Sequence, residues 1–393
     1  MSINENMLRL STYEVIGELP NPFRFNDGTV VRTKEDWNRR RIEIVDVAVD
    51  MQFGVFPPAP DFFDIELLFK GKEQSSYKIT TGTKKRQVSF LMKVILPPET
   101  DKCPVIINGD LCANYYMQPG FVDAALSNGI GWVFFDRTEL AHDVQGEGRG
   151  RGALYKAYSE HDFGAIAAWA WGYSRCVDAL HQIHDQSIDL NWISATGHSR
   201  GGKAAILAGA VDERIRVVNP NEACLGGGGC YRIYSEGDYL NLDRWPSETL
   251  YDILKENDFW FGPEMSSYIG RENLLPFDAH YLKALIAPRI LFVSEAAGDM
   301  WANPVGAWQT TIAAKEVFDY LGVPDNLFWY FRSGTHYHKT IDVQMLVNVI
   351  LHCRNGVPLL NGYFITPFCK YEMIFGWKAP INDGLRDNRR DEG

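Results

Sequence analysis

The sequence has no cysteine pattern that is typical of a disulfide scaffold or a zinc site. Its 393 residues contain seven cysteines, an odd number, and no two of them form a CxxC pair. They are scattered along the chain at Cys103, Cys112, Cys176, Cys224, Cys230, Cys353 and Cys369. At least one thiol must therefore stay free, and we expect most of them to be buried and unpaired, with no bound metal.

The sequence also lacks an excess of basic residues and any long apolar run. Lysine and arginine number 39 against 50 acidic residues, a net charge of −11, which argues against a nucleic-acid partner. No apolar run is long enough to span a bilayer, so we expect no membrane partner. Residues Met1 to Leu19 are polar and show no secretory signal. That pattern fits a cytoplasmic protein or a secreted one whose signal has been removed.

The composition is that of a globular protein with a large core. Hydrophobic residues make up 46% of the chain and charged residues 23%. Although the length could hold two domains, α/β enzymes often form one unit of this size. We expect a single catalytic domain over residues 1–393, as a monomer. Residues 1–60 would form an N-terminal cap segment and residues 231–280 an insertion over the sheet edge.

Alternating strand and helix patterns predict an α/β fold. Residues 77–80 and 87–96 have the alternating, β-branched texture of antiparallel edge strands. Shorter apolar runs, typical of buried parallel strands, follow at 103–109, 131–136, 188–195, 215–220, 289–294 and 327–332. Helical spacing appears at 34–47, 122–127, 163–183, 307–320 and 343–352. The rhythm predicts a mostly parallel sheet flanked by helices in three layers.

One stretch carries the clearest chemical signal. Gly197-His198-Ser199-Arg200-Gly201 follows a predicted strand and precedes a helix of small residues. This G-x-S-x-G arrangement is the nucleophile elbow of the α/β-hydrolase fold. The two glycines let the backbone crowd around the serine without Cβ clashes, and the following helix brings N–H groups toward a developing oxyanion.

Polar residues follow the later strands in the order that such a hydrolase requires. Ser199 leaves the elbow strand, Glu222 the next strand, Asp299 the one after, and His336 the last. In parallel sheets these loops meet at one edge. We therefore expect Ser199 as nucleophile, His336 as base, and Glu222 or Asp299 as the acid that orients the imidazole.

The oxyanion would be held by the N–H of Arg200 and by a donor from the loop near Asn108 and Gly109. Lys203 adds a second cation to the first turns of the helix after Ser199. Cations are unfavourable at a helix N-terminus, where the dipole prefers anions. Their presence beside a nucleophile suggests a substrate with negative charge or many oxygens.

Each assignment has an alternative. His338 could be the base in place of His336, although His336 comes first after the strand. Glu222 could be a structural carboxylate bonded to the N–H groups of the glycine run that follows it. Asp299 could cap a loop. His198, beside the serine on a tight turn, is expected to be structural.

Beyond these local patterns, the sequence resembles the glucuronoyl esterases, a carbohydrate esterase family whose nucleophile motif is G-C-S-R-x-G-K. The motif stands here as residues 197–203, with His198 in place of the cysteine, as expected of the bacterial branch. Further matching stretches lie at 27–28, 36–37, 212–215, 219–230, 285–289, 298–301, 321–326 and 334–336.

The resemblance implies a serine esterase that cleaves esters of glucuronic or 4-O-methylglucuronic acid, as in lignin–carbohydrate linkages of glucuronoxylan, without a cofactor. It places Glu222 in the family's usual acid position and Asp299 in an alternative one. It also implies that Arg200 assists the oxyanion. Lys203, Trp301 and Glu248 would hold the oxygens of the sugar acid.

The chain departs from that family in three respects, one of which is that residues 231–247 look longer than in its members. The cysteine pair of the secreted fungal members looks to be replaced by His198 and Lys339, so that disulfide is absent. Cys224 stands where a small polar residue is usual. These changes bear on the substrate preference. Two other functions stay open as alternatives: an acetylxylan or other carbohydrate esterase, and a carbohydrate-binding protein that has lost catalysis.

Overall fold

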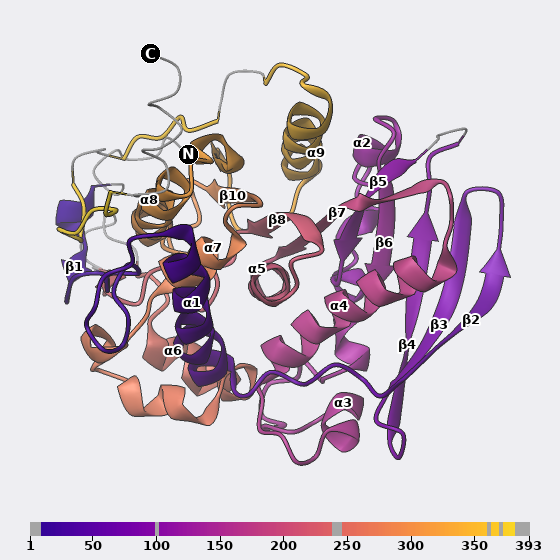
Figure 1. Ribbon diagram of the computed structural model, residues 1–393, viewed down its shortest axis with the longest axis horizontal. Coiled ribbons are helices and arrows are strands. Elements are labelled where there is room, and N and C mark those ends of the chain that lie inside the picture. Colours follow the sequence, from indigo (N-terminus) through magenta and orange to yellow (C-terminus); the bar gives the residue numbers. More distant parts are fainter. Residues whose placement is uncertain (1–8, 99–101, 238–245, 360–362, 369–371, 382–393) are drawn as a thin grey trace.

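A nine-stranded sheet runs through the part of the chain that the computed structural model describes, residues 9–98, 102–237, 246–359, 363–368 and 372–381 (Figure 1). The strand order is β11-β10-β8-β7-β5-β6-β4-β3-β2. In chain order the strands are β2 (Phe62–Lys70), β3 (Gln74–Gly82), β4 (Gln87–Ile95), β5 (Cys103–Asn108), β6 (Gly131–Phe135), β7 (Ile188–His198), β8 (Ile215–Asn221), β10 (Ile290–Ala296) and β11 (Leu327–Arg332).

The sheet is parallel from β11 to β6 and antiparallel from β6 to β2. Both properties were expected from the sequence. Strands β5 and β6 are buried at every position, because helices cover both of their faces, whereas β4 alternates between buried and exposed residues. The mostly parallel sheet and its helical layers form an α/β-hydrolase fold.

Helices cover the two faces of the sheet and give the core two parts. On one face, α4, α5, α7 and α8 contribute to the larger apolar cluster, while α2 and α9 contribute to the smaller one on the other. Strand β5 supplies both, since Val105 and Ile107 face the first cluster and Ile106 the second. The helices are α1 (Lys34–Val45), α2 (Asp123–Leu126), α3 (Ala153–Ala157), α4 (Ala165–Ile183), α5 (Arg200–Val211), α6 (Leu250–Asn257), α7 (Ala279–Ile286), α8 (Pro304–Tyr320) and α9 (Thr340–Asn355).

The N-terminal region is tied to the rest of the fold through α1. Thr33 and Asp36 form a capping box that starts this helix, with Thr33 Oγ1 accepting from the Asp36 N–H at 3.1 Å. Arg41, near its other end, donates to the backbone carbonyls of Leu285 and Ala287, both at 2.9 Å. Residues 1–8 of the expected cap segment lie outside the described residues.

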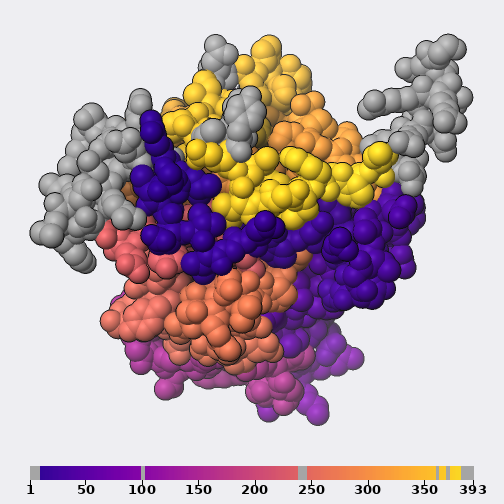
Figure 2. All heavy atoms as spheres, turned by 90° about the vertical axis from the view of Figure 1, so that its left-hand side faces the viewer, coloured from indigo at the N-terminus to yellow at the C-terminus, as the bar shows by residue number. Residues whose placement is uncertain are grey.

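Segments from both ends of the described chain lie side by side on one face, as Figure 2 shows in indigo and yellow. The N–H of Leu19 donates to the carbonyl of Ile374 at 3.0 Å, and the indole N–H of Trp377 donates to the carbonyl of Leu19 at 2.8 Å. The two-stranded pair β1 (Glu14–Val15) and β9 (Ile233–Tyr234) joins the N-terminal segment to the region of the expected insertion.

That region, 231–280, is more regular than its composition suggested. It contains helix α6, whose capping box joins Thr249 and Asp252, followed by short 3₁₀ segments. Residues 238–245, within the expected insertion, lie outside the described residues. Among the described helices, none combines the length and apolar character needed to cross a bilayer.

The central strands should dominate stability. Ile107 on β5 has no exposed surface and is paired with neighbours on both sides, so Ile107→Ala should lower the free energy of unfolding by about 2–5 kcal/mol. Leu91→Ala on β4, where the side chain is half exposed, should change it by less than about 1 kcal/mol. Chemical denaturation followed by circular dichroism measures both, and equal losses would contradict this picture of the core.

Candidate active site

Ser199 occupies a strained turn between β7 and α5. Its backbone φ is 56° and its ψ is −120°, a region that residues with a Cβ rarely adopt. The turn is held by a hydrogen bond from the Ser199 N–H to the carbonyl of Asn221, at 3.0 Å. This is the backbone of a nucleophile elbow, which places the serine at the carboxyl edge of the sheet.

The glycines around Ser199 are required by close backbone contacts. A Cβ on Gly197 would lie 2.3 Å from the carbonyl oxygen of Gly201, and one on Gly201 would lie 2.0 Å from the carboxylate of Asp110. The same Asp110 carboxylate accepts the N–H of His198 at 2.8 Å. The crowding expected from the G-x-S-x-G pattern is therefore present, with a buried aspartate as part of it.

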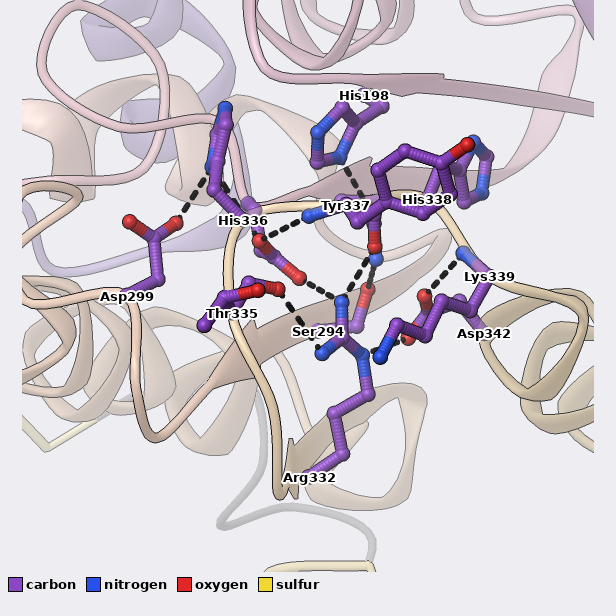
Figure 3. Close-up of polar contacts among 12 residues, drawn as sticks. His198, Ser294, Asp299, Arg332, Thr335, His336, Tyr337, His338, Lys339 and Asp342 are labelled. Carbon is purple, nitrogen blue, oxygen red and sulfur yellow. Dashed lines mark hydrogen bonds and ion pairs between the residues drawn. The ribbon is translucent and has the colours of Figure 1, made fainter. Parts of the chain in front are cut away.

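His336 contacts both carboxylates that the sequence analysis named. Its Nδ1 lies 2.5 Å from Asp299 Oδ2, as Figure 3 shows. The same nitrogen lies 3.3 Å from Glu222 Oε2. Each of the three residues follows a different parallel strand: Glu222 follows β8, Asp299 follows β10 and His336 follows β11. Because these strands end at one edge of the sheet, residues over a hundred positions apart meet there.

The two carboxylates differ in their other partners. Glu222 has no exposed surface; its Oε1 pairs with the guanidinium of Arg332 and its Oε2 accepts the Tyr337 N–H at 3.2 Å. Asp299 is 5% exposed, and besides His336 its Oδ1 accepts the N–H of Ala302 at 3.3 Å. Glu222 is therefore tied to the loop that carries His336, whereas Asp299 makes its shortest contact with the imidazole itself.

Burial and charge shift the pKa values of this group in opposite directions. Burial alone would lower the pKa of His336, but the hydrogen bonds and charges of Asp299 and Glu222 raise it to about 9. Burial raises the pKa of Glu222 to about 7, even though His336 and Arg332 act to lower it. The imidazolium form of His336 is thus strongly favoured between its two acids.

The other two histidines near the site, His198 and His338, are buried. His338 is 1% exposed and packs its ring edge-on against Phe121, 5.0 Å between centroids. His198 is also buried, its Nδ1 is 2.7 Å from Asn221 Oδ1, and its ring centre is 4.4 Å from that of His336. Burial lowers the pKa of both groups, so both are neutral packing groups.

Ser199 and His336 open onto one cavity of about 420 Å³. Helix α6 forms one of its walls. The cavity is lined by Gln145, Ser199, Arg200, Lys203, Cys224, Glu248, Asp252, Ile253, Lys255, Glu256, Asn257, Trp260, Trp301 and His336. It thus contains Ser199, His336 and all three residues that the resemblance assigned to sugar binding, whereas His338 is not part of its lining.

Those three residues differ strongly in exposure. Lys203 is 2% exposed, and its Nζ lies 5.7 Å from the ring centre of Trp260. Trp301 is 45% exposed, and its carbonyl accepts the N–H of Glu248 at 2.9 Å. Burial raises the pKa of Glu248, although the charge of Lys203 opposes that shift. The cavity therefore offers a buried cation, a carboxyl group and an exposed aromatic ring.

Arg200 is held over the cavity by an aromatic ring and a carboxylate. Its guanidinium carbon lies 4.5 Å from the ring centre of Trp260, and Nη1 is 3.2 Å from Asp143 Oδ1. The indole N–H of Trp260 donates to the same Asp143 oxygen at 3.1 Å. Arg137, which is buried, contacts the other oxygen of Asp143 at 2.9 Å and so holds that carboxylate in place.

Two N–H groups of the loop after β5 donate to partners within the protein. The N–H of Gly109 donates to the hydroxyl of Tyr173 at 3.0 Å, and the N–H of Asp110 donates to Asn108 Oδ1 at 2.8 Å. Both groups are therefore engaged in holding the loop. These two N–H groups are satisfied within the protein, and the expected oxyanion donor from the loop near Asn108 and Gly109 stays a prediction.

Sequence reasoning missed several residues that support the site. Arg332 could have been found from the sequence, because it is a charged residue at the end of an apolar strand. It also lies only four positions before His336, which indicates a structural role near the site. Asp143 lies in a loop and Trp260 in a short 3₁₀ helix, neither with a periodic pattern in the sequence, and only the fold brings them to Arg200. They could not be found by motif or spacing.

Two groups of three metal-ligating side chains share His336. One joins it with His198 and Glu222, the other with Cys224 and Asp299, and in each group the ligand atoms lie within 4.8 Å of one another. The imidazole already contacts the one carboxylate of each group, Glu222 in the first and Asp299 in the second. The expectation that the chain binds no metal stays a prediction. The six cysteines that the structure describes are unpaired, and Cys369 lies outside the described residues.

Comparison with known proteins gives consistent results. A family model described as "Glucuronyl esterase, fungi" matches residues 79–322. The 4-O-methyl-glucuronoyl methylesterase of Podospora anserina is 34% identical over 329 residues, which cover 82% of this chain and 64% of that protein. The chain thus spans slightly under two thirds of the length of that relative.

Solved structures are similar over almost the whole chain. The glucuronoyl esterase catalytic domain from Hypocrea jecorina has a TM-score of 0.77 and 28% identity, covering 95% of this chain and 99% of that one. A Sporotrichum thermophile glucuronoyl esterase variant in complex with methyl 4-O-methyl-β-D-glucopyranuronate has a TM-score of 0.75 and 26% identity, covering 92% and 94%. With the matched model and the Podospora relative, these results show that the chain belongs to the glucuronoyl esterase family.

Proposed function

We propose that this protein is a serine esterase that hydrolyses esters of glucuronic acid or 4-O-methylglucuronic acid through an acyl-enzyme. The observation that carries the proposal is that Ser199, His336 and Lys203 line one cavity. The ester found with the Sporotrichum relative supports the substrate class. An alcohol linked to the sugar acid, such as a lignin alcohol, would be the leaving group.

In the first half of the reaction, Ser199 Oγ attacks the ester carbonyl and His336 takes its proton. Because Asp299 contacts Nδ1 of His336, the other ring nitrogen, Nε2, is the one available to Ser199. The tetrahedral intermediate then expels the alcohol, which receives that proton from His336. In the second half, His336 takes a proton from a water molecule that attacks the acyl-enzyme. The acyl–Oγ bond then breaks, Ser199 Oγ receives that proton from His336, and the free acid is released.

Asp299 is the stronger candidate for the acid that orients His336. Its contact with Nδ1 is 2.5 Å, against 3.3 Å for Glu222, whose other oxygen pairs with Arg332. This ranking reverses the order that the resemblance implies, in which Glu222 holds the usual position. Both carboxylates would stabilise the imidazolium that forms during each half-reaction.

The remaining lining residues would bind the sugar acid. Arg200, at the start of α5, adds a guanidinium and a helix N-terminal N–H close to the developing oxyanion. Lys203 and Glu248 would bond to hydroxyl or ring oxygens, and Trp301 would pack against the sugar ring. Placing cations beside the reacting carbonyl favours an acyl group rich in oxygens.

Replacing the nucleophile tests the reaction class. Ser199→Ala should abolish hydrolysis of benzyl glucuronate and labelling by a fluorophosphonate, because both need the hydroxyl, while leaving circular dichroism unchanged. Hydrolysis retained by this variant would contradict the serine mechanism. A wild-type protein that is not labelled would instead favour a carbohydrate-binding protein without catalysis.

Replacing each of two lysines of the cavity, Lys203 and Lys255, distinguishes a glucuronate esterase from an acetyl esterase. Lys203→Met should raise KM for benzyl glucuronate roughly tenfold to hundredfold, since a hydrogen bond from a charged donor is worth about 1.5–3 kcal/mol. Lys255→Met, at the exposed side of the same cavity, is the matched control and should change it little. If acetylated xylan is the better substrate and Lys203→Met has no effect, the protein is an acetyl-type carbohydrate esterase.

The pH dependence should identify the acting acid. Ser199 is activated only by neutral His336, so kcat/KM should fall as pH drops below the raised pKa of about 9. Asp299→Asn removes the nearer charge, so this acid limb should move to lower pH while the plateau falls roughly 10²–10⁴-fold. Glu222→Gln should give the smaller shift. The reverse order in a pH–rate series would assign the role to Glu222.

A further inference from the structure

Arg332, the last residue of β11, has a buried guanidinium with a carboxylate on either side. Its Nε donates to Asp342 Oδ1 at 2.7 Å (Figure 3), and its Nη2 donates to Glu222 Oε1. Glu222 in turn contacts His336. One cation therefore joins the start of helix α9, which carries Asp342, to the group around the histidine.

The loop that carries His336 wraps around the same guanidinium. Nη1 donates to the carbonyls of Ser333 and Thr335, both at 3.3 Å, and Nη2 donates to the carbonyl of Tyr337 at 2.6 Å. These carbonyls flank His336 on both sides in the sequence. The path of the loop is thus defined by an arginine that never enters the substrate cavity.

Arg332 fits this place in a way that other cations cannot. A guanidinium has five N–H donors in a rigid plane, and here the acceptors are two carboxylates and three carbonyls, five in all. Gly334, with φ of +110°, brings the loop so close that a Cβ there would lie 3.2 Å from Nη1. A lysine has three donors at one point and could satisfy only part of this set.

We propose that Arg332 is a positioning residue for His336: it holds the loop 333–337 and Glu222 in the arrangement in which the imidazole can serve Ser199. The proposal rests on the serine esterase mechanism above and adds residues that this mechanism does not include. Arg332 acts through Glu222 and the loop backbone, and Asp342 holds the guanidinium from the far side. Displacing a catalytic group by about 1 Å can cost on the order of 10²-fold in rate.

The test compares Arg332→Gln and Arg332→Lys with Arg216→Gln. Arg216 lies on β8 with its guanidinium 5.2 Å from the ring centre of Trp192, away from the site, and is the matched control. Arg332→Gln should lower kcat about tenfold to a hundredfold, because His336 is no longer held in the geometry that the transition state needs. KM should stay nearly unchanged, because the residues that line the cavity are intact. Arg332→Lys should recover part of this loss, and the control should match the wild type.

The number of active sites in the Arg332 variants shows whether Arg332 positions His336 or only keeps the protein folded. A fluorophosphonate labels Ser199, so the labelled fraction gives the number of active sites and the labelling rate reports activation of the serine. Positioning predicts full labelling at a reduced rate. Full labelling at the wild-type rate, or a loss of kcat that only mirrors fewer labelled sites, would overturn the proposal.

A double-mutant cycle tests the route through Glu222. If Arg332 acts partly through that carboxylate, Arg332→Gln should cost less in a Glu222→Gln background than alone, whereas additive effects would refute this route. If Arg332→Gln does not fold, Asp342→Asn is the alternative variant, because it keeps Arg332 and removes the charge of one of its two carboxylate partners. It should reduce the labelling rate several-fold, and an unchanged rate would count against the proposal.

The labelling rate also distinguishes this proposal from the proposed function. It depends on Ser199 and His336 but not on the substrate. If the wild type is labelled yet does not hydrolyse glucuronate esters, the substrate assignment fails while Arg332 can still be tested. If the wild type hydrolyses them and Arg332→Gln changes neither kcat nor labelling, only the positioning role fails.

Discussion

The site depends on a carboxylate, Glu222, that has no contact with solvent. An isolated buried carboxylate would be strongly unfavourable, and here the guanidinium of Arg332, the Tyr337 N–H and His336 surround it. These partners come from the end of β11 and the loop that follows it. The ion pair spans β10, which lies between β8 and β11 in the sheet.

Because of this arrangement, the loops after β8, β10 and β11 depend on one another. The N–H of Gly298 donates to the carbonyl of Gly334 at 2.8 Å, so the loop of Asp299 and the loop of His336 also touch through their backbones. A change in any of these loops would move the imidazole relative to Ser199. The elbow and the network of three loops together bring Ser199 and His336 to one cavity.

The positions of Arg200 and Lys203 in the cavity also depend on residues from distant segments of the chain. Arg200 is next to Ser199 in the sequence, but Asp143 and Trp260 decide where its guanidinium lies. Lys203 is one helical turn further on and is almost completely buried. The helix that begins at Arg200 thus places two cations in the cavity that Ser199 lines, and both lie against the ring of Trp260.

Much of the fold could be predicted from the sequence, because its signals are local. The apolar runs of β5 and β6, the alternation of β4 and the turn at Ser199 each depend on neighbouring residues, whose spacing reflects helix and strand geometry. The order of Ser199, Glu222, Asp299 and His336 at strand ends was readable for the same reason. The regular helix α6 was missed, since its segment is rich in polar and aromatic residues.

The relation between the two acids could not be read from the chain. Both Glu222 and Asp299 follow strands, so their spacing favours neither, and only distances of 3.3 and 2.5 Å to one nitrogen separate them. The support from Arg332, and the capture of the Gly109 N–H by Tyr173, likewise depend on contacts between distant segments.

The sequence by itself therefore determined the kind of chemistry, because a nucleophile elbow is a local backbone feature that a few adjacent residues specify. The tertiary structure decided which groups surround that nucleophile. Hydrogen bonds and ion pairs among His336, its acids and Arg332 form only where the sheet brings the ends of separate strands together, and their strength depends on distances that no spacing along the chain encodes.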